Sequence, residues 1–304
     1  MAFMRAVMCV DRGRILPKAM KFDDVRDELQ LEQLDANLFR GWSPPRRRAI
    51  FGGLVLGQSL HAAVRTIDPA LTTHSLHCYF LRPGNAEIPT IYEVDRIRDG
   101  RSFTTRRVLA IQDGKAIFSM SASFQVAEKG FEHQAPMPDV PGPEELPSEE
   151  ERRREVAEHL PEEFREWFLQ EQPIDLRPLD PPNFLEGQKY EPVQRAWIRS
   201  RVQLPAEDIH LHQCVLAYAS DLTLLGTSSR PHGVSWLMEN FQSASLDHAM
   251  WFHRPFRADE WLLYVMDSPS ASNARGFNRG SIYTRDGLLV ASVAQEGLIR
   301  YHES

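Results

Sequence analysis

The chain has 304 residues, of which 42% are hydrophobic and 25% charged, a composition typical of a globular protein long enough for two ordinary domains. Its net charge of −7 argues against a nucleic-acid-binding protein, and no apolar run approaches the ~18 residues that a membrane span needs. The three cysteines (Cys9, Cys78 and Cys214) are far apart, which argues against a disulfide framework and favours a reducing, cytoplasmic location.

The N-terminal segment contains a short apolar patch interrupted by Arg5, Asp11, Arg12 and Arg14, which makes a poor secretory signal. We therefore interpret residues 1–24 as a tail. Further on, Arg46, Arg47 and Arg48 follow two prolines. This basic cluster is either a solvated loop or an electrostatic site for an anionic substrate, and the sequence leaves both readings open.

Residues 51–64 are apolar nearly all round, which predicts a buried helix. Gly57 lies inside this helix, where a glycine costs about 1 kcal/mol relative to alanine. Such a glycine indicates that another backbone passes close to it. The Gly52-Gly53 pair at the start belongs to no phosphate-binding glycine motif, so no nucleotide-binding fold is implied.

Four strand-like runs follow this helix. An Asp-Gly pair at 113–114, between two apolar runs, is a strong signal for a β-hairpin. The first half of the chain therefore reads as one helix followed by an antiparallel sheet, with strands expected at residues 74–82, 88–98, 103–111 and 117–126.

Residues 127–190 have a different character, because prolines recur at both ends of the segment. Ser148 and Glu151 form a capping box, which predicts the start of a surface helix. We interpret this segment as a long connector that packs along the outside of the molecule.

The second half repeats the pattern of the first. A helix is predicted at residues 211–225, and strands at 193–204, 241–252, 261–266, 277–284 and 288–299. The segment Phe80-Leu81-Arg82-Pro83 returns as Phe252-His253-Arg254-Pro255, 172 positions later. The hairpin pair Asp113-Gly114 returns as Asp286-Gly287. Two copies of one architecture explain these matches better than two unrelated domains.

Several motifs together resemble the acyl-CoA thioesterase II family of bacteria and peroxisomes. They are Leu38-Phe39-Arg40-Gly41, Phe51-Gly52-Gly53 with Gly57-Gln58, the run from His74 to Phe80, Tyr218-Ala219-Ser220-Asp221, the run from Leu246 to His253, and Gln295-Glu296-Gly297. The resemblance covers roughly residues 25–302 and implies an α+β double hotdog fold, in which each half wraps an antiparallel sheet around a long helix. The implied units are residues 25–127 and 191–304, joined by the connector at 128–190.

The resemblance also implies a catalytic site. In that family an Asp, a Ser or Thr, and a Gln orient the hydrolytic water, and these roles fall here on Asp221, Ser245 and Gln295. Without the resemblance, Asp221 could equally cap its helix, and the other two could be structural. The first-half counterparts are Thr73 and Ala122. Because alanine cannot bind water, we expect one chemical site per chain.

The remaining expectations concern substrate and partners. The substrate is expected to be an acyl-CoA, with no cofactor and no metal, and homo-oligomerisation is expected by analogy. Gly52, Gly53 and Arg275 are candidate substrate-binding residues, and Arg279 is a further candidate for the CoA phosphates. His77 and His248 are interpreted as polar anchors in the interior. A hotdog enoyl-CoA hydratase and a non-catalytic acyl-CoA-binding protein remain the alternatives.

Overall fold

The computed structural model describes residues 22–44, 49–158, 160, 162, 165, 168–181, 187–235 and 238–302. Most of the predicted tail and the Arg46–Arg48 cluster therefore lie outside the described residues.

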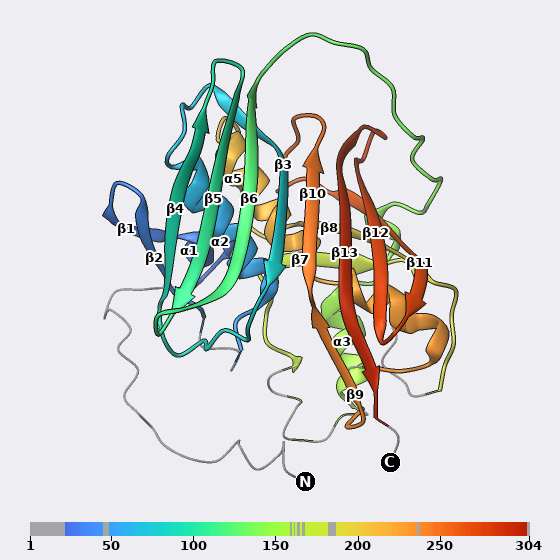
Figure 1. The fold of residues 1–304 in the computed structure, drawn as a ribbon. Coiled ribbons are helices and arrows are strands. Elements are labelled where there is room, and N and C mark those ends of the chain that lie inside the picture. The colour runs from blue at the N-terminus through green and yellow to red at the C-terminus, as the bar shows by residue number, and fades with distance from the viewer. Residues whose placement is uncertain are drawn as a thin grey trace.

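A large antiparallel sheet forms the body of the molecule (Figure 1). The first half comprises α1 (Val25–Leu29), β1 (Leu31–Asp35), β2 (Leu38–Gly41), α2 (Gly52–Val64), β3 (Leu71–Phe80), β4 (Thr90–Asp99), β5 (Phe103–Gln112) and β6 (Lys115–Val126). The connector holds η2 (Pro143–Glu145), α3 (Glu149–Ala157) and β7 (Ile174–Pro178). The second half comprises β8 (Val193–Ser200), α5 (Ile209–Ser220), η3 (Leu225–His232), β9 (Phe241–Ser245), β10 (Asp247–Phe252), β11 (Leu262–Ser272), β12 (Arg275–Thr284) and β13 (Leu289–Tyr301).

The two halves join edge to edge through β3 and β10. The strand order is β1-β2-β4-β5-β6-β3-β10-β13-β12-β11-β8-β7, and β9 pairs with β13 as well. At the junction His77 lies opposite Ala249, and these two residues are 172 positions apart. That separation equals the repeat in the sequence, so the pseudo-twofold axis that relates the halves passes through this pair.

The helices α2 and α5 lie side by side and antiparallel within the curve of the sheet (Figure 1). A Cβ atom at Gly53 would lie 2.3 Å from the carbonyl oxygen of Tyr218, and one at Gly57 would lie 3.1 Å from that of Cys214. The glycines therefore allow the two helices to approach closely, and the close backbone approach expected at Gly57 is confirmed. Burial of both apolar helices between the halves creates a single core that they share.

Three local expectations differ from the structure. The helix predicted at 211–225 ends at Ser220, and a 3₁₀ segment begins at Leu225. The strand predicted at 241–252 is divided at Leu246, whose N–H donates to the carbonyl of Glu296 and whose carbonyl accepts from Phe80. The proline-rich connector contributes a strand, β7, whose buried Ile174 and Leu176 extend the sheet beside β8.

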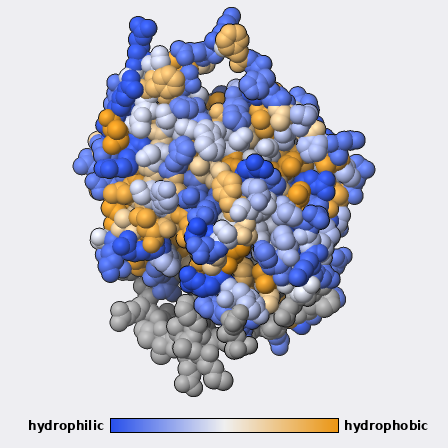
Figure 2. Space-filling view, turned by 45° about the vertical axis from the view of Figure 1, so that its right-hand side comes forward, coloured by the Kyte–Doolittle hydropathy of each residue, from blue (hydrophilic) through white to orange (hydrophobic). Residues whose placement is uncertain are grey.

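His77 also differs from its prediction, because its side chain is exposed rather than interior. It lies on the outer surface of β3, where its ring packs edge-on against Trp251 at 5.3 Å. The reason is strand alternation, since the neighbours Leu76 and Cys78 occupy the inner face. The side of the molecule seen in Figure 2 is largely hydrophilic, with apolar side chains gathered in scattered patches.

Candidate active site

The structure brings Asp221, Ser245 and Gln295 together from three elements. Asp221 is the C-cap of α5, Ser245 is the last residue of β9, and Gln295 lies fully buried on β13. Gln295 Nε2 donates to Asp221 Oδ1 over 2.6 Å and lies 3.2 Å from Ser245 Oγ. Ser245 Oγ in turn donates to Asp221 Oδ1 over 3.4 Å. The predicted trio is thus one connected cluster, although its members are up to 74 positions apart.

The orientation of the Gln295 amide follows from its partners. A carboxylate only accepts hydrogen bonds, so the nitrogen rather than the oxygen must face Asp221. The opposite end, Oε1, is buried and has no hydrogen-bond partner among the residues that the structure describes. A buried acceptor in this condition calls for a donor such as a water molecule. The cluster therefore presents a carboxylate, a hydroxyl and a free amide oxygen within one small region.

His248 lies directly behind Gln295. Its Nδ1 atom is 3.2 Å from Gln295 Nε2, and its Nε2 atom is 2.9 Å from Ser220 Oγ. The side chain is fully buried, and this burial lowers its pKa to about 3. The imidazole is therefore neutral at physiological pH, and the interior position expected for His248 is confirmed.

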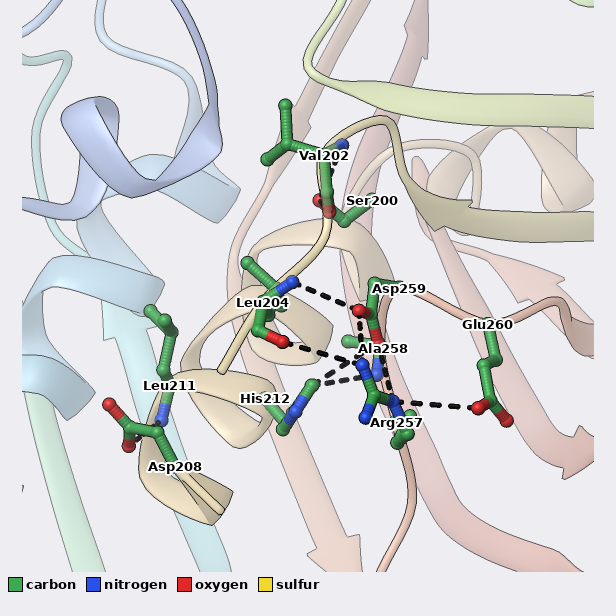
Figure 3. Close-up of polar contacts among 10 residues, drawn as sticks. All are labelled: Ser200, Val202, Leu204, Asp208, Leu211, His212, Arg257, Ala258, Asp259 and Glu260. Carbon is green, nitrogen blue, oxygen red and sulfur yellow. Dashed lines mark hydrogen bonds and ion pairs between the residues drawn. The ribbon is translucent and has the colours of Figure 1, made fainter. Parts of the chain in front are cut away.

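Both ends of α5 are fixed, which sets the position of Asp221. At the start of the helix, Asp208 caps the backbone N–H of Leu211, and His212 Nδ1 accepts from the N–H of Ala258 over 3.0 Å (Figure 3). The loop that carries Ala258 is tied down by Asp259, which accepts from Leu204 N–H and pairs with Arg257 (Figure 3).

At the other end of α5, Tyr264 donates its hydroxyl to the carbonyl of Ser220 over 2.9 Å. Burial, together with the nearby Asp221 carboxylate, raises the pKa of Tyr264 well above its usual value. The phenol is therefore neutral and remains a donor. The Tyr264 hydroxyl thus holds Ser220, the last residue of α5, and thereby helps to position the adjacent Asp221.

The start of α2, from the first half, reaches the same cluster. A Cβ atom at Gly52 would lie 2.6 Å from Asp221 Oδ2. The first amides of a helix have no acceptor within the helix, and they point along its axis at the positive end of the helix dipole. Gly53 lies against the carbonyl of Tyr218 instead, so packing alone accounts for its lack of a side chain.

The predicted arginines are not part of this cluster. Arg275 lies on β12, opposite Leu298 of β13, and its Nε donates to Glu296 over 2.9 Å. Glu296 alternates with Gln295, so Arg275 lies on the outer face of the sheet, away from the trio. Arg279 shares that face and pairs with Asp267.

The pseudo-equivalent place in the first half carries no such cluster. By register, Leu76 and Ala122 occupy the positions of His248 and Gln295. Ala122 also pairs with Arg106, as Gln295 pairs with Asn278. The Arg106 side chain is buried, and its Nε donates to Thr66 Oγ1 over 2.9 Å. A guanidinium therefore fills the region that the second half leaves to small polar groups.

Two further observations concern metal binding and membrane insertion. Within the described part of the chain, no three His, Cys, Asp or Glu side chains lie close enough to hold a metal ion. No described helix is long and apolar enough to cross a membrane.

Ser220 and Tyr264 were not singled out from the sequence, although a signal existed for Tyr264. It recurs as Tyr92 in the first half at the same spacing of 172, and Tyr92 likewise donates to a buried helix residue, Gln58.

Comparisons with known proteins identify the family of the chain. A family model described as acyl-CoA thioesterase matches residues 164–298, and one described as acyl-CoA thioesterase N-terminal domain matches residues 39–125. Human acyl-coenzyme A thioesterase 8 is 42% identical over 96% of this chain and 93% of its own length. Acyl-CoA thioesterase 2 of Haemophilus influenzae is 41% identical over 90% of this chain and 96% of its own.

Solved structures give the same picture. The crystal structure of an acyl-CoA thioesterase II from Mycobacterium marinum is 49% identical, covers 91% of this chain and 98% of its own, and superimposes with a TM-score of 0.72. A hot dog fold protein of unknown function from Alicyclobacillus acidocaldarius, at 20% identity, has a TM-score of 0.73 and covers 91% of this chain and 97% of its own. The expected double hotdog fold is thereby confirmed.

Proposed function

The chain belongs to the acyl-CoA thioesterase family and is a thioester hydrolase, and from this premise we propose that Asp221 is the general base that activates water. Ser245 and Gln295 hold that water. The observation that carries the proposal is the cluster itself, in which Gln295 Nε2 and Ser245 Oγ both bond the same oxygen of Asp221 while Gln295 Oε1 stays free to accept.

The proposed reaction needs no covalent enzyme intermediate. Asp221 takes a proton from water while the water oxygen attacks the thioester carbonyl carbon. The carbonyl oxygen becomes negatively charged. The tetrahedral intermediate then collapses, the C–S bond breaks, and the proton held by Asp221 passes to the departing sulfur. The products are a carboxylic acid and CoA. General-base assistance of this kind contributes about 10²–10⁴ in rate.

We propose that the first half contributes the stabilising charge for the oxyanion. The backbone amides of Gly52 and Gly53 stand at the start of α2, and Gly52 lies against Asp221. Free amides at a helix N-terminus favour a developing negative charge. Arg275 remains a predicted contact for CoA, and its place on the outer face of the sheet would suit the nucleotide end rather than the acyl end.

A thiol-release assay with a series of acyl-CoAs tests the proposal. One free thiol and one acid should appear per turnover, and a variant without Asp221 should lose this release. The rival enoyl-CoA hydratase would consume the enoyl double bond without releasing thiol. A non-catalytic acyl-CoA-binding protein would bind the same ligands and leave them intact.

We further propose that the chain self-associates through the outer face of its two central strands. Tyr79 is 62% exposed and Trp251 36%, and His77 packs beside Trp251. Exposed aromatic side chains that gather in this way are typical of interfaces. Light scattering on the purified protein measures the mass of the assembly, and a monomeric mass would refute self-association.

The cytoplasmic location stays a prediction from the cysteine pattern.

A further inference from the structure

The hydrogen-bond inventory around Gln295 leaves one side chain without a role in the proposed reaction. Gln295 Nε2 carries two hydrogens but has three acceptors around it, namely Asp221 Oδ1 at 2.6 Å, Ser245 Oγ at 3.2 Å and His248 Nδ1 at 3.2 Å. His248 is fully buried and lies behind the amide, where it touches neither substrate nor water in the proposed mechanism. Of the trio, Gln295 is the residue that His248 contacts, so an effect of His248 on the water would pass through this amide.

The proton on His248 can be assigned from its other neighbour. Ser220 Oγ donates its own hydrogen to the carbonyl of Ala217 over 2.9 Å, so toward His248 it can only accept. The imidazole hydrogen must therefore lie on Nε2, which leaves a lone pair on Nδ1. Burial holds the ring neutral by lowering its pKa to about 3, so a second hydrogen does not compete for that lone pair.

This tautomer has a consequence for the amide. His248 Nδ1 carries a lone pair and Asp221 carries a negative charge, so both are hydrogen-bond acceptors. The end of the Gln295 amide that faces them must therefore be the NH₂ group. If the amide turned by 180°, its oxygen would face Asp221 Oδ1 and His248 Nδ1, which are both acceptors, and only the Ser245 hydroxyl could still donate to it. The observed rotation instead leaves Oε1 free of partners among the described residues, so it can receive a hydrogen from water.

The first half of the chain supports a joint role for the two residues. Leu76 and Ala122 occupy the same pair of register positions there, so both polar side chains are replaced together. A histidine kept only for packing could persist without the glutamine. The same comparison shows that a leucine is compatible with this place in the sheet.

The geometry points to His248 as a positioning residue that fixes the rotation of the Gln295 amide and so aims its oxygen at the hydrolytic water. This inference rests on the proposed role of Gln295. The relay that sets it runs from Ala217 carbonyl through Ser220 hydroxyl to the imidazole, and it ends at the amide.

Steady-state kinetics of four variants test the inference. The variants are His248→Leu, Gln295→Ala, the double variant His248→Leu/Gln295→Ala, and His248→Asn, whose amide oxygen can replace Nδ1 as acceptor. We expect His248→Leu to lower kcat by about tenfold to 10²-fold with little change in KM, because a misplaced group costs about that much. His248→Asn should recover part of the loss.

The double variant is decisive, because residues that act through one another are not additive. It should turn over no more slowly than Gln295→Ala alone. Multiplication of the two losses, or wild-type kcat in His248→Leu, would overturn the inference. Full activity of Gln295→Ala would instead refute the proposed role of Gln295, so the two failures are distinguishable.

A further variant guards against misfolding. If His248→Leu lacks a cooperative unfolding transition, Ser220→Ala removes only the hydroxyl that selects the tautomer. It should then lower kcat in a wild-type background and leave kcat unchanged in Gln295→Ala. An equal loss in both backgrounds would contradict the relay.

Discussion

Gly52 lies so close to Asp221 that a Cβ atom on residue 52 would stand 2.6 Å from the carboxylate oxygen Oδ2. The two residues belong to different halves of the chain, since Gly52 begins α2 and Asp221 ends α5. The proposed base of the second half is therefore placed against the helix start of the first half. From this contact we expect the chemical site to depend on both halves, although the trio comes entirely from one of them.

The first prediction concerns this contact. In Gly52→Ala the new methyl group would meet both Asp221 Oδ2 and the Phe80 ring, whose Cε1 atom would lie 2.9 Å away. The carboxylate must move, so we expect kcat to fall by about tenfold to 10²-fold. The matched control is Gly226→Ala, where a Cβ atom meets nothing within 4 Å. Equal kcat values for the two variants would show that the position of Asp221 is not critical.

The second prediction concerns the hydroxyl of Ser245. Ser245→Thr keeps the hydroxyl and should retain activity within a fewfold of wild type. Ser245→Ala removes one partner of the water and of Asp221, and the loss of one such hydrogen bond should cost about tenfold in kcat. The measurement is kcat for thiol release by both variants. If the alanine variant matches the threonine variant, Ser245 only packs.

The third prediction concerns the dependence of the second half on the first. A fragment of residues 164–304 keeps β7 and the whole trio but exposes the edge of β10 and the apolar side of α5, which β3 and α2 normally cover. Such surfaces favour aggregation. We expect an aggregated fragment with little activity, and partial recovery when residues 1–150 are supplied as a second chain. A soluble monomer with full activity would contradict a shared site.

The fourth prediction concerns stability against pH. The pKa of His248 is about 3 in the folded protein but about 6.5 in the unfolded chain, so between these two pH values the unfolded state binds this proton and the folded state does not. The free energy of unfolding should therefore fall as the pH drops from 6.5, by up to about 1.4 kcal/mol per pH unit from this group alone.

Urea unfolding at several pH values between 6.5 and 5 measures this effect. Other histidines, such as the half-buried His61, have lowered pKa values and contribute in the same direction, so the comparison with His248→Leu isolates one residue. In His248→Leu the free energy of unfolding should depend less steeply on pH, and the difference in slope should correspond to the uptake of up to one proton on unfolding. Identical slopes would show that His248 does not take up a proton on unfolding.

Much of the fold could be predicted from the sequence because its signals are local. Apolar runs gave the helix α2 and the strands, and Asp113-Gly114 gave the β5–β6 hairpin, where both residues have positive φ. The break at Leu246 could not be predicted, because it depends on hydrogen bonds to Glu296 and Phe80 from distant strands. The strand β7 was missed for a similar reason, since its pairing with β8 outweighs a proline-rich setting.

The candidate site divides in the same way. Asp221, Ser245 and Gln295 were identified through a resemblance of motifs, and the structure brings them within hydrogen-bond distance. Ser220 lies in one of the motifs that carry the resemblance, but it was given no role, because a serine within an apolar helix gives no signal of its own. Its role depends on the imidazole of His248, which a different strand brings to it.

The rate constant kcat for acyl-CoA hydrolysis by Asp221→Asn tests whether Asp221 is the general base. Asparagine has nearly the same shape but accepts no proton at neutral pH, so kcat should fall by about 10²–10⁴. The matched control is Asp208→Asn at the opposite end of α5, where asparagine also caps a helix and activity should be kept. A folded Asp221→Asn enzyme with the kcat of the Asp208→Asn control would show that Asp221 is not the general base.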